Sequence, residues 1–245
     1  MLVVGGGQQG HGIEDPPLGN GRAMAILFSH EAAAVAVADL DLASAEETAA
    51  LCDSAVAIEA DAADEPSVER MLAVAADALG GLDGIVLNVG IGAGFGVQGT
   101  SVEEWDQVLA VNLRAHFLGC KHGLPLLADG GAIVLISSLA ATEYMPIPAY
   151  GASKAALESL TRSAAVEGAP AVRVNLVKPG LIDTPLGRLA SEISKGRGQV
   201  RIPLRRQGTA WDVAYAALYL LSAEAAYVTA TALVVDGGLS QAPRV

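Results

Sequence analysis

The first 25 residues, "MLVVGGGQQGHGIEDPPLGNGRAMA" (1–25), place a short apolar run, a long glycine-rich stretch and the start of a helical pattern in succession. A strand, a glycine-rich turn and a helix in this order are typical of a dinucleotide site. Glycine lets the backbone approach a pyrophosphate, and the helix N-terminus offers free N–H groups. The stretch is longer than such a turn requires, and the spacing fits best if Gly19, Asn20 and Gly21 open the helix.

The rest of the chain alternates between short β-branched runs and alanine-rich helical patterns. Hydrophobic residues make up 52% of the 245 positions and charged residues 17%, which suits strands buried on both faces of a parallel sheet. We therefore expect a single-domain Rossmann-type α/β fold over residues 1–245, a doubly wound parallel sheet of about seven strands with helices on both faces. The expected strands are 1–4, 33–39, 55–61, 84–90, 132–138, 172–180 and 232–238, and the expected helices are 22–28, 44–51, 67–79, 102–118, 151–166 and 210–221.

Charge and hydropathy exclude several classes of partner. The formal net charge of −12 would repel nucleic acid, so no nucleic-acid partner is expected. No apolar stretch approaches the 18 or so residues of a membrane span, so no membrane association is expected. The two cysteines are too few for a disulfide framework, and no secretory leader precedes the first strand, so we expect reduced thiols and a cytoplasmic location.

The second expected strand ends on an acidic residue, Asp39, 18 positions after Gly21. In a dinucleotide fold, a carboxylate about 20 residues beyond the glycines binds the ribose hydroxyls. The same carboxylate repels a 2′-phosphate, and the next residue, Leu40, offers no counter-charge. The sequence therefore favours NAD over NADP as the cofactor.

The most specific cluster of reactive side chains is "YGASK" (150–154), which places Tyr150 and Lys154 one helical turn apart. Tyrosine ordinarily has a pKa of about 10, too high for a base at neutral pH. A cation one turn away stabilises the phenolate and lowers that pKa toward neutrality. The pair is therefore a candidate for general acid/base catalysis.

Over residues 2–238 the chain resembles the short-chain dehydrogenase/reductase family of the common type. The motifs are "GNGRA" (19–23), "LNVG" (87–90), "VNL" (111–113), "IVLISSLAA" (133–141), "YGASK" (150–154), "KPGLIDT" (178–184) and "VVDGG" (234–238). The family opens with T-G-x-x-x-G-x-G. If Gly6 is its first glycine, the helix arginine, Arg22, comes about nine residues late. Residues 11–18 are therefore an insertion in the glycine-rich loop, which costs only about 0.6 kcal/mol of closure entropy per doubling of loop length.

The resemblance implies a tetrad of catalytic residues. Tyr150 would be the general acid/base, and Ser138, with Ser137 as the alternative, would hold the carbonyl oxygen. Lys154 would tune the tyrosine and bind the nicotinamide ribose, and Asn112 would help to hold a proton-relaying water.

The resemblance also implies the residues that bind the cofactor. On the phosphate and adenosine side they are Gly6, Gly19, Asn20, Gly21, Asp39, Leu40, Asp61, Ala62, Asn88, Val89 and Gly90, and on the nicotinamide side Tyr150, Lys154, Pro179, Gly180, Ile182 and Thr184. No metal is expected, and we interpret His116 and Cys120, which share a helix face, as structural rather than as metal ligands.

The family implies hydride transfer between NAD and a secondary alcohol or ketone. Two alternatives stay open, an NADPH-dependent 3-oxoacyl thioester reductase and a non-catalytic NAD-binding sensor. Family members are usually homodimers or homotetramers built on the helices that here correspond to 102–118 and 151–166, and we expect a homotetramer.

Two irregular segments remain. Residues 186–209 correspond to the family's substrate lid, and the part from 188 to 206 holds six of the 15 basic residues against a single acid, Glu192. A basic lid on an acidic body predicts an anionic substrate. In the insertion 11–18, the Pro16–Pro17 pair favours an extended backbone and restricts Asp15, so we expect a semi-rigid flap near the pyrophosphate.

Overall fold

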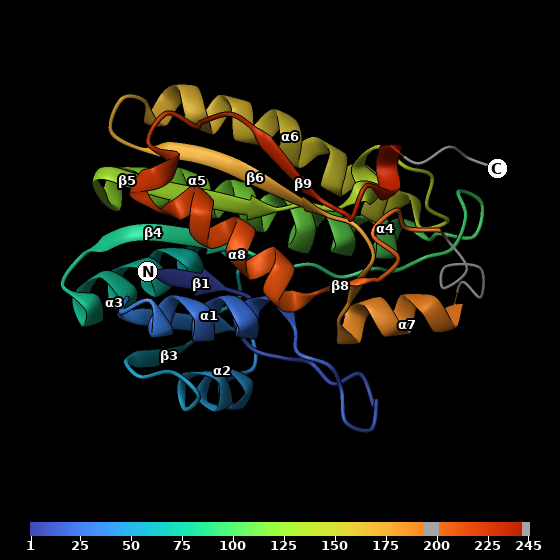
Figure 1. The fold of residues 1–245 in the computed structure, drawn as a ribbon, viewed down its shortest axis with the longest axis horizontal. Coiled ribbons are helices and arrows are strands. Elements are labelled where there is room, and N and C mark those ends of the chain that lie inside the picture. The colour runs from blue at the N-terminus through green and yellow to red at the C-terminus, as the bar shows by residue number, and fades with distance from the viewer. Residues whose placement is uncertain (194–200, 242–245) are drawn as a thin grey trace.

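The structure is a computed structural model that describes residues 1–193 and 201–241. Its centre is a seven-stranded sheet in the order β3-β2-β1-β4-β5-β6-β9, and every neighbouring pair is parallel (Figure 1). The strands are β1 (Leu2–Val4), β2 (Val35–Asp39), β3 (Ala55–Glu59), β4 (Leu82–Leu87), β5 (Leu127–Ile136), β6 (Arg173–Pro179) and β9 (Ala232–Val235). The expected fold class is confirmed.

Helices cover both faces of the sheet, and the two hydrophobic cores lie between the sheet and these layers (Figure 1). The strands alternate between the cores: Leu2 and Val4 of β1 face the layer of α3, α5 and α6, whereas Val3 faces the layer of α1 and α8. The helices are α1 (Asn20–His30), α2 (Leu42–Ala49), α3 (Glu65–Leu79), α4 (Val102–Leu109), α5 (Ala115–Gly123), α6 (Pro148–Gly168), α7 (Pro185–Ile193) and α8 (Ala210–Leu221). Among the described residues, no helix is both long and apolar enough to cross a bilayer.

The expected helix 102–118 is not continuous. The sequence there forms α4, then a π-helical turn (Ala110–Arg114), and then α5. Ser101 and Glu104 form a capping box at the start of α4, so that end is defined by the sequence. A π-helical turn often marks a functional site in a helix, and this one contains Asn112.

The segment 186–209 is more regular than expected. Its first part belongs to α7, and its last residues form strand β8 (Gly208–Thr209), which pairs with β7 (Ile182–Asp183). The expectation of an irregular segment is therefore wrong for residues 186–193. Lys195 and Arg197 lie outside the described residues.

The glycine-rich stretch leaves β1, forms a loop and returns to start α1 at Asn20. Asp15 has φ of +50° rather than the extended backbone expected of a residue before proline, and His11 also has φ of +50°. Aspartate tolerates this left-handed conformation better than most residues. The loop is thus a bent excursion at Asp15, and the expectation of an extended backbone there is wrong.

Candidate active site

The four catalytic candidates lie at the carboxyl edge of the sheet. Ser138 follows the end of β5, Tyr150 and Lys154 lie in the first two turns of α6, and Asn112 lies in the π-helical turn that packs against α6. The carboxyl ends of parallel strands are where open α/β sheets bind ligands. The fold therefore brings together residues that span more than 40 positions in the sequence.

Asn112 is fully buried, and its side-chain amide is committed to neighbours. Its Oδ1 accepts from the Ile91 N–H at 2.8 Å, while its Nδ2 donates to the Ile91 carbonyl at 2.9 Å and to the Ser153 hydroxyl at 3.1 Å. These bonds join the end of β4 to α6. They hold the two catalytic candidates of α6, Tyr150 and Lys154, in place relative to the sheet.

Lys154 is only 3% exposed, and its ammonium lies among few polar groups. Its Nζ donates to the carbonyl of Ile136, the last residue of β5, at 2.9 Å. Burial lowers the pKa of Lys154 to about 7, because the charged form loses its hydration. The same Nζ lies 5.8 Å from the centroid of the Tyr150 ring. An amine that titrates near neutral pH therefore lies beside the candidate acid/base.

The two neighbouring serines occupy different environments. Ser137 is buried, and its hydroxyl donates to the backbone carbonyl of Lys154 at 2.8 Å. Ser138 is partly exposed, and its hydroxyl accepts from the Ala140 N–H at 3.2 Å. A hydroxyl that contacts substrate must reach solvent before substrate binds, and this favours Ser138 over Ser137.

The glycine-rich turn has the shape that a pyrophosphate cradle needs. A Cβ on Gly21 would lie 1.9 Å from the carbonyl oxygen of Gly5, so only glycine allows the start of α1 to approach the end of β1 so closely. A Cβ on Gly6 would lie 2.7 Å from a Val37 methyl group. At the same place, the Asn20 Oδ1 atom is buried without a hydrogen-bond partner among the described residues. These residues fit a dinucleotide.

Asp39 ends β2 beside this turn, and backbone groups hold its carboxylate in place. Its Oδ2 accepts from the Gly7 N–H at 2.9 Å, and its Oδ1 accepts from the Asp41 N–H at 3.2 Å. Leu40 is 65% exposed. A carboxylate in a fixed orientation beside an exposed apolar side chain is the arrangement expected for NAD.

Most of the remaining cofactor candidates lie at or just beyond the carboxyl ends of β3, β4 and β6. Asp61 is exposed after β3, and its backbone N–H donates to the Ser67 hydroxyl. Asn88 follows β4, and its Nδ2 donates to the Gly5 carbonyl at 2.9 Å, which ties β4 to the start of the glycine-rich turn. The other candidates are Gly19 before α1, Ala62 after β3, Val89 and Gly90 after β4, Pro179 at the end of β6, and Gly180, Ile182 and Thr184 beyond it.

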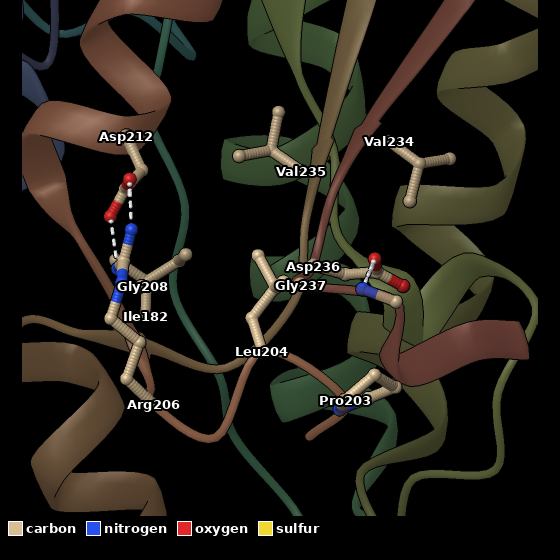
Figure 2. Close-up of a pocket in the computed structure, with 11 residues that line it drawn as sticks. Ile182, Pro203, Leu204, Arg206, Gly208, Asp212, Val234, Val235, Asp236 and Gly237 are labelled. Atoms are coloured by element: carbon tan, nitrogen blue, oxygen red, sulfur yellow. Dashed lines mark hydrogen bonds and ion pairs between the residues drawn. The ribbon is translucent and has the colours of Figure 1, made fainter. Parts of the chain in front are cut away.

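A separate hollow with a volume of about 460 Å³ lies between β9 and the segment that leads into β8 (Figure 2). Its lining includes Leu204, Val235 and Asp236, and at one side the ion pair of Arg206 with Asp212 closes it. It shares Ile182 with the cofactor candidates, but it contains none of the four catalytic candidates. We therefore assign the candidate active site to the sheet edge, outside this hollow.

The segment 188–206 carries less unpaired positive charge than its composition suggests. Arg188 forms two hydrogen bonds with Asp183, at 2.8 and 3.0 Å, and Arg206 forms two with Asp212, both at 2.8 Å. Both aspartates are therefore stabilised as carboxylates, and the arginine next to Asp212 lowers the pKa of that residue well below its usual range. Of the four basic residues of this segment that the structure describes, Arg188 and Arg206 thus have acidic partners.

Sequence reasoning missed two residues of this region, Ser153, which contacts Asn112, and the loop residue Gln8, which contacts Gly19. His116, which the sequence analysis interpreted as structural, is buried, and its Nε2 lies 3.0 Å from the Leu87 carbonyl oxygen. Burial and the nearby Lys154 lower the pKa of His116 well below its usual range, so it is neutral. Ser153 lies within "YGASK", so its place in that motif was the signal that could have identified it. The sequence held no comparable signal for Gln8.

We expect the burial of Lys154 to make stability depend on pH. The pKa of this lysine is about 7 in the folded protein and 10.5 in the unfolded chain. Between these two pH values the unfolded chain holds a proton on Lys154 that the folded protein lacks. The contribution of Lys154 to stability therefore rises with pH in this range, by at most about 1.4 kcal/mol per pH unit. Below pH 7 the cost of burying the ammonium is fully present. Chemical denaturation should therefore show Lys154→Met more stable than wild type at pH 6, with the difference shrinking by pH 9.

Lys121→Met is the control, since Lys121 is exposed and paired with Glu65. Its stability difference from wild type should stay constant over the same pH range. A constant difference for Lys154→Met as well would show that burial does not perturb this lysine.

Comparisons with known proteins agree with this geometry. The family model for enoyl-(acyl carrier protein) reductases matches residues 18–240. The 2-(R)-hydroxypropyl-CoM dehydrogenase of Xanthobacter autotrophicus is 41% identical over 233 residues, which cover 89% of this chain and 93% of that protein. The 3beta-hydroxysteroid dehydrogenase 1 of Eggerthella lenta is 36% identical over 199 residues, which cover 78% and 76%.

A solved structure from Brucella melitensis, a short-chain dehydrogenase/reductase described as a glucose/ribitol dehydrogenase, superposes with a TM-score of 0.87 at 31% identity. The superposition covers 97% of this chain and 94% of that one. With a parallel sheet in this strand order and reactive residues at its carboxyl edge, the chain belongs to the short-chain dehydrogenase/reductase family, whose members are oxidoreductases that use a nicotinamide cofactor.

Proposed function

We propose that this protein is an NAD-dependent dehydrogenase that interconverts a secondary alcohol and its ketone. The observation that supports this most is the cluster at the ends of β4 and β5, where Lys154 lies beside Tyr150 and Asn112 binds the adjoining turn of α6. A protein that only senses NAD would not need an acid/base pair in this position. The tetrad thus favours catalysis over sensing.

In the proposed mechanism, NAD would accept the hydride, the hydrogen with its bonding electron pair, that leaves the alcohol carbon. Tyr150 as the phenolate takes the proton of the substrate hydroxyl and becomes the phenol, and in the reverse direction the phenol returns this proton to the carbonyl oxygen. The Ser138 hydroxyl donates a hydrogen bond to the same oxygen and stabilises the charge that develops there. Because the Tyr150 and Ser138 hydroxyls would both contact the same substrate oxygen, they would restrict how the substrate carbon is oriented toward the cofactor.

Lys154 couples its proton to that of Tyr150. A phenolate beside the amine favours the charged ammonium, and the ammonium in turn favours the phenolate, so each charge stabilises the other. The amide of Asn112 is committed to Ile91 and Ser153. A π-helical turn skips a carbonyl that an α-helix would use. We propose that a backbone carbonyl of this turn holds the relay water.

The substrate proposed here is a small secondary alcohol that carries an anionic group. One relative is named as a 2-(R)-hydroxypropyl-CoM dehydrogenase, and a 2-hydroxypropyl group is a secondary alcohol. Arg201 and Arg205 are exposed in the described part of the segment 188–206, and they are the basic residues proposed to attract the anionic group. Arg188 and Arg206 are left out of this proposal, since Asp183 and Asp212 already neutralise them.

The proposed assembly is a homotetramer. The helices α4, α5 and α6 expose apolar side chains that include Val102, Phe117 and Val166. Exposed apolar side chains on neighbouring helices are typical of surfaces that pack against another subunit.

Turnover is tested with a panel of neutral and anionic secondary alcohols, by the absorbance of reduced cofactor. We expect the anionic alcohols to have the lower KM, and we expect that KM to rise with ionic strength. Tyr150→Phe should keep NAD affinity but less than a few per cent of the rate, because the ring remains while the transferable proton is lost. A rate near that of the wild type in Tyr150→Phe would disprove the acid/base assignment.

Cofactor choice is tested by comparing kcat/KM for NAD and NADP. We expect a preference for NAD of more than a hundredfold, because burying a phosphate against the fixed Asp39 carboxylate costs a few kcal/mol. Asp39→Ala should reduce this preference at least tenfold, whereas the control Asp61→Ala should leave it nearly unchanged. Equal efficiency with both cofactors in the wild type would instead support the NADPH-dependent thioester reductase.

The tetramer is tested by light scattering at micromolar concentration, where the mass should be about four times 24.8 kDa. Phe117→Arg should lower this mass, since it places a charge on the proposed contact. The matched control Leu51→Arg changes an exposed apolar residue outside the three helices and should leave the mass unchanged. A monomeric wild type would disprove the proposal.

A further inference from the structure

We infer that Gln8 is a positioning residue that holds the two ends of the interrupted glycine-rich turn together. In doing so it keeps the first turn of α1 aligned for the cofactor. This inference rests on the NAD-dependent function proposed above, and it goes beyond that function by assigning a role to a residue at a variable position of the family's motif.

Gln8 bridges three separate segments of the chain. Its side-chain Oε1 accepts from the Gly19 N–H at 2.8 Å, which joins the outgoing and returning ends of the loop. Its backbone N–H donates to the Ser44 hydroxyl at 2.6 Å, and that hydroxyl donates to the Gln8 carbonyl at 3.1 Å. The loop ends are thereby attached to α2 as well as to each other. We call the contacts of Gln8 with Gly19 and Ser44 the loop clasp.

The clasp joins the two points of the glycine-rich turn that the insertion separates. In a turn of family length, the chain itself holds the first glycine and the helix start at a short separation. Here residues 9–18 intervene between Gln8 and Gly19, so the covalent connection no longer fixes that separation. Gly19 is the N-cap of α1 and provides no side chain to cap the helix. The Gln8 amide supplies a polar contact at this point instead.

The clasp leaves the phosphate-binding groups accessible. It occupies the N–H of Gly19, which precedes the helix, while the N–H groups of the first three helical residues, Asn20 to Arg22, have no intrahelical partner and are the groups that would bind an anion. On the other side, the Gly7 N–H donates to Asp39, which fixes the turn next to the ribose-binding carboxylate. Gln8 thus lies between the two cofactor-binding parts of the turn without replacing either.

The test compares Gln8→Ala with Gln9→Ala in the full chain. Gln9 is the exposed neighbour of the same residue type, and within the described residues it forms no hydrogen bond through its side chain. Losing one hydrogen bond that orders the site should raise the NAD dissociation constant about threefold to tenfold in Gln8→Ala. The kcat at saturating NAD should stay unchanged, because the clasp touches no catalytic residue. Gln9→Ala should match wild type in both measurements.

A second parent protein with a shortened loop distinguishes the proposed clasp from a general structural role of Gln8. Deleting residues 9–17 restores the G-x-x-x-G-x-G spacing from Gly6 to Gly21, so that the chain itself closes the turn. In this shortened protein, Gln8→Ala should no longer change NAD affinity. An equal loss of affinity in the full and the shortened chain would overturn the proposal, and so would unchanged affinity of Gln8→Ala in the full chain.

Hydrogen exchange without cofactor gives an independent measurement. Peptides that cover residues 5–25 should exchange faster in Gln8→Ala than in wild type, while Gln9→Ala should not differ. If the wild-type protein does not bind NAD, the proposed function is wrong. The hydrogen-exchange rate alone then tests whether Gln8 holds the two ends of the loop together. Unchanged exchange in Gln8→Ala would overturn the clasp whatever the cofactor.

Discussion

Burial of an all-parallel sheet between two helical layers is the constraint on which the other features depend. Each parallel strand must be followed by a crossover, so every strand ends at the same edge of the sheet. Asp39, Asn88, Ser138 and Pro179 follow or end four different strands and come together for this reason alone. The same burial removes water from Lys154 and lowers its pKa. Packing and chemistry at this edge therefore have one cause.

Much of the fold could be predicted from the sequence. Each of the seven expected strands is present, and the expected helix 210–221 has the bounds observed for α8, because alternating apolar runs and helical periodicity report burial directly. The break in helix 102–118 could not be predicted, since a π-helical turn changes the hydrogen-bond register without interrupting the apolar pattern. Helix α7 was not expected, because Pro185 and Gly187 in its first turn weaken the helical pattern of the sequence.

The site was predictable only where a motif specified it. Tyr150 and Lys154 lie one turn apart, so their proximity follows from helix geometry. The pairing of Arg188 with Asp183 and of Arg206 with Asp212 depends on local geometry, so a count of charges overstated the free positive charge of the lid. The bond from Gln8 to Gly19 likewise joins residues whose approach depends on the path of the loop between them.

A loop whose base is held by a side chain has an evolutionary consequence. Once Gln8 fixes both ends, the number and identity of the residues between them no longer affect the geometry of the helix start. Natural variation can then lengthen, shorten or replace this segment without loss of the fold. Insertions and deletions, as well as point substitutions, would then alter the surface next to the start of α1.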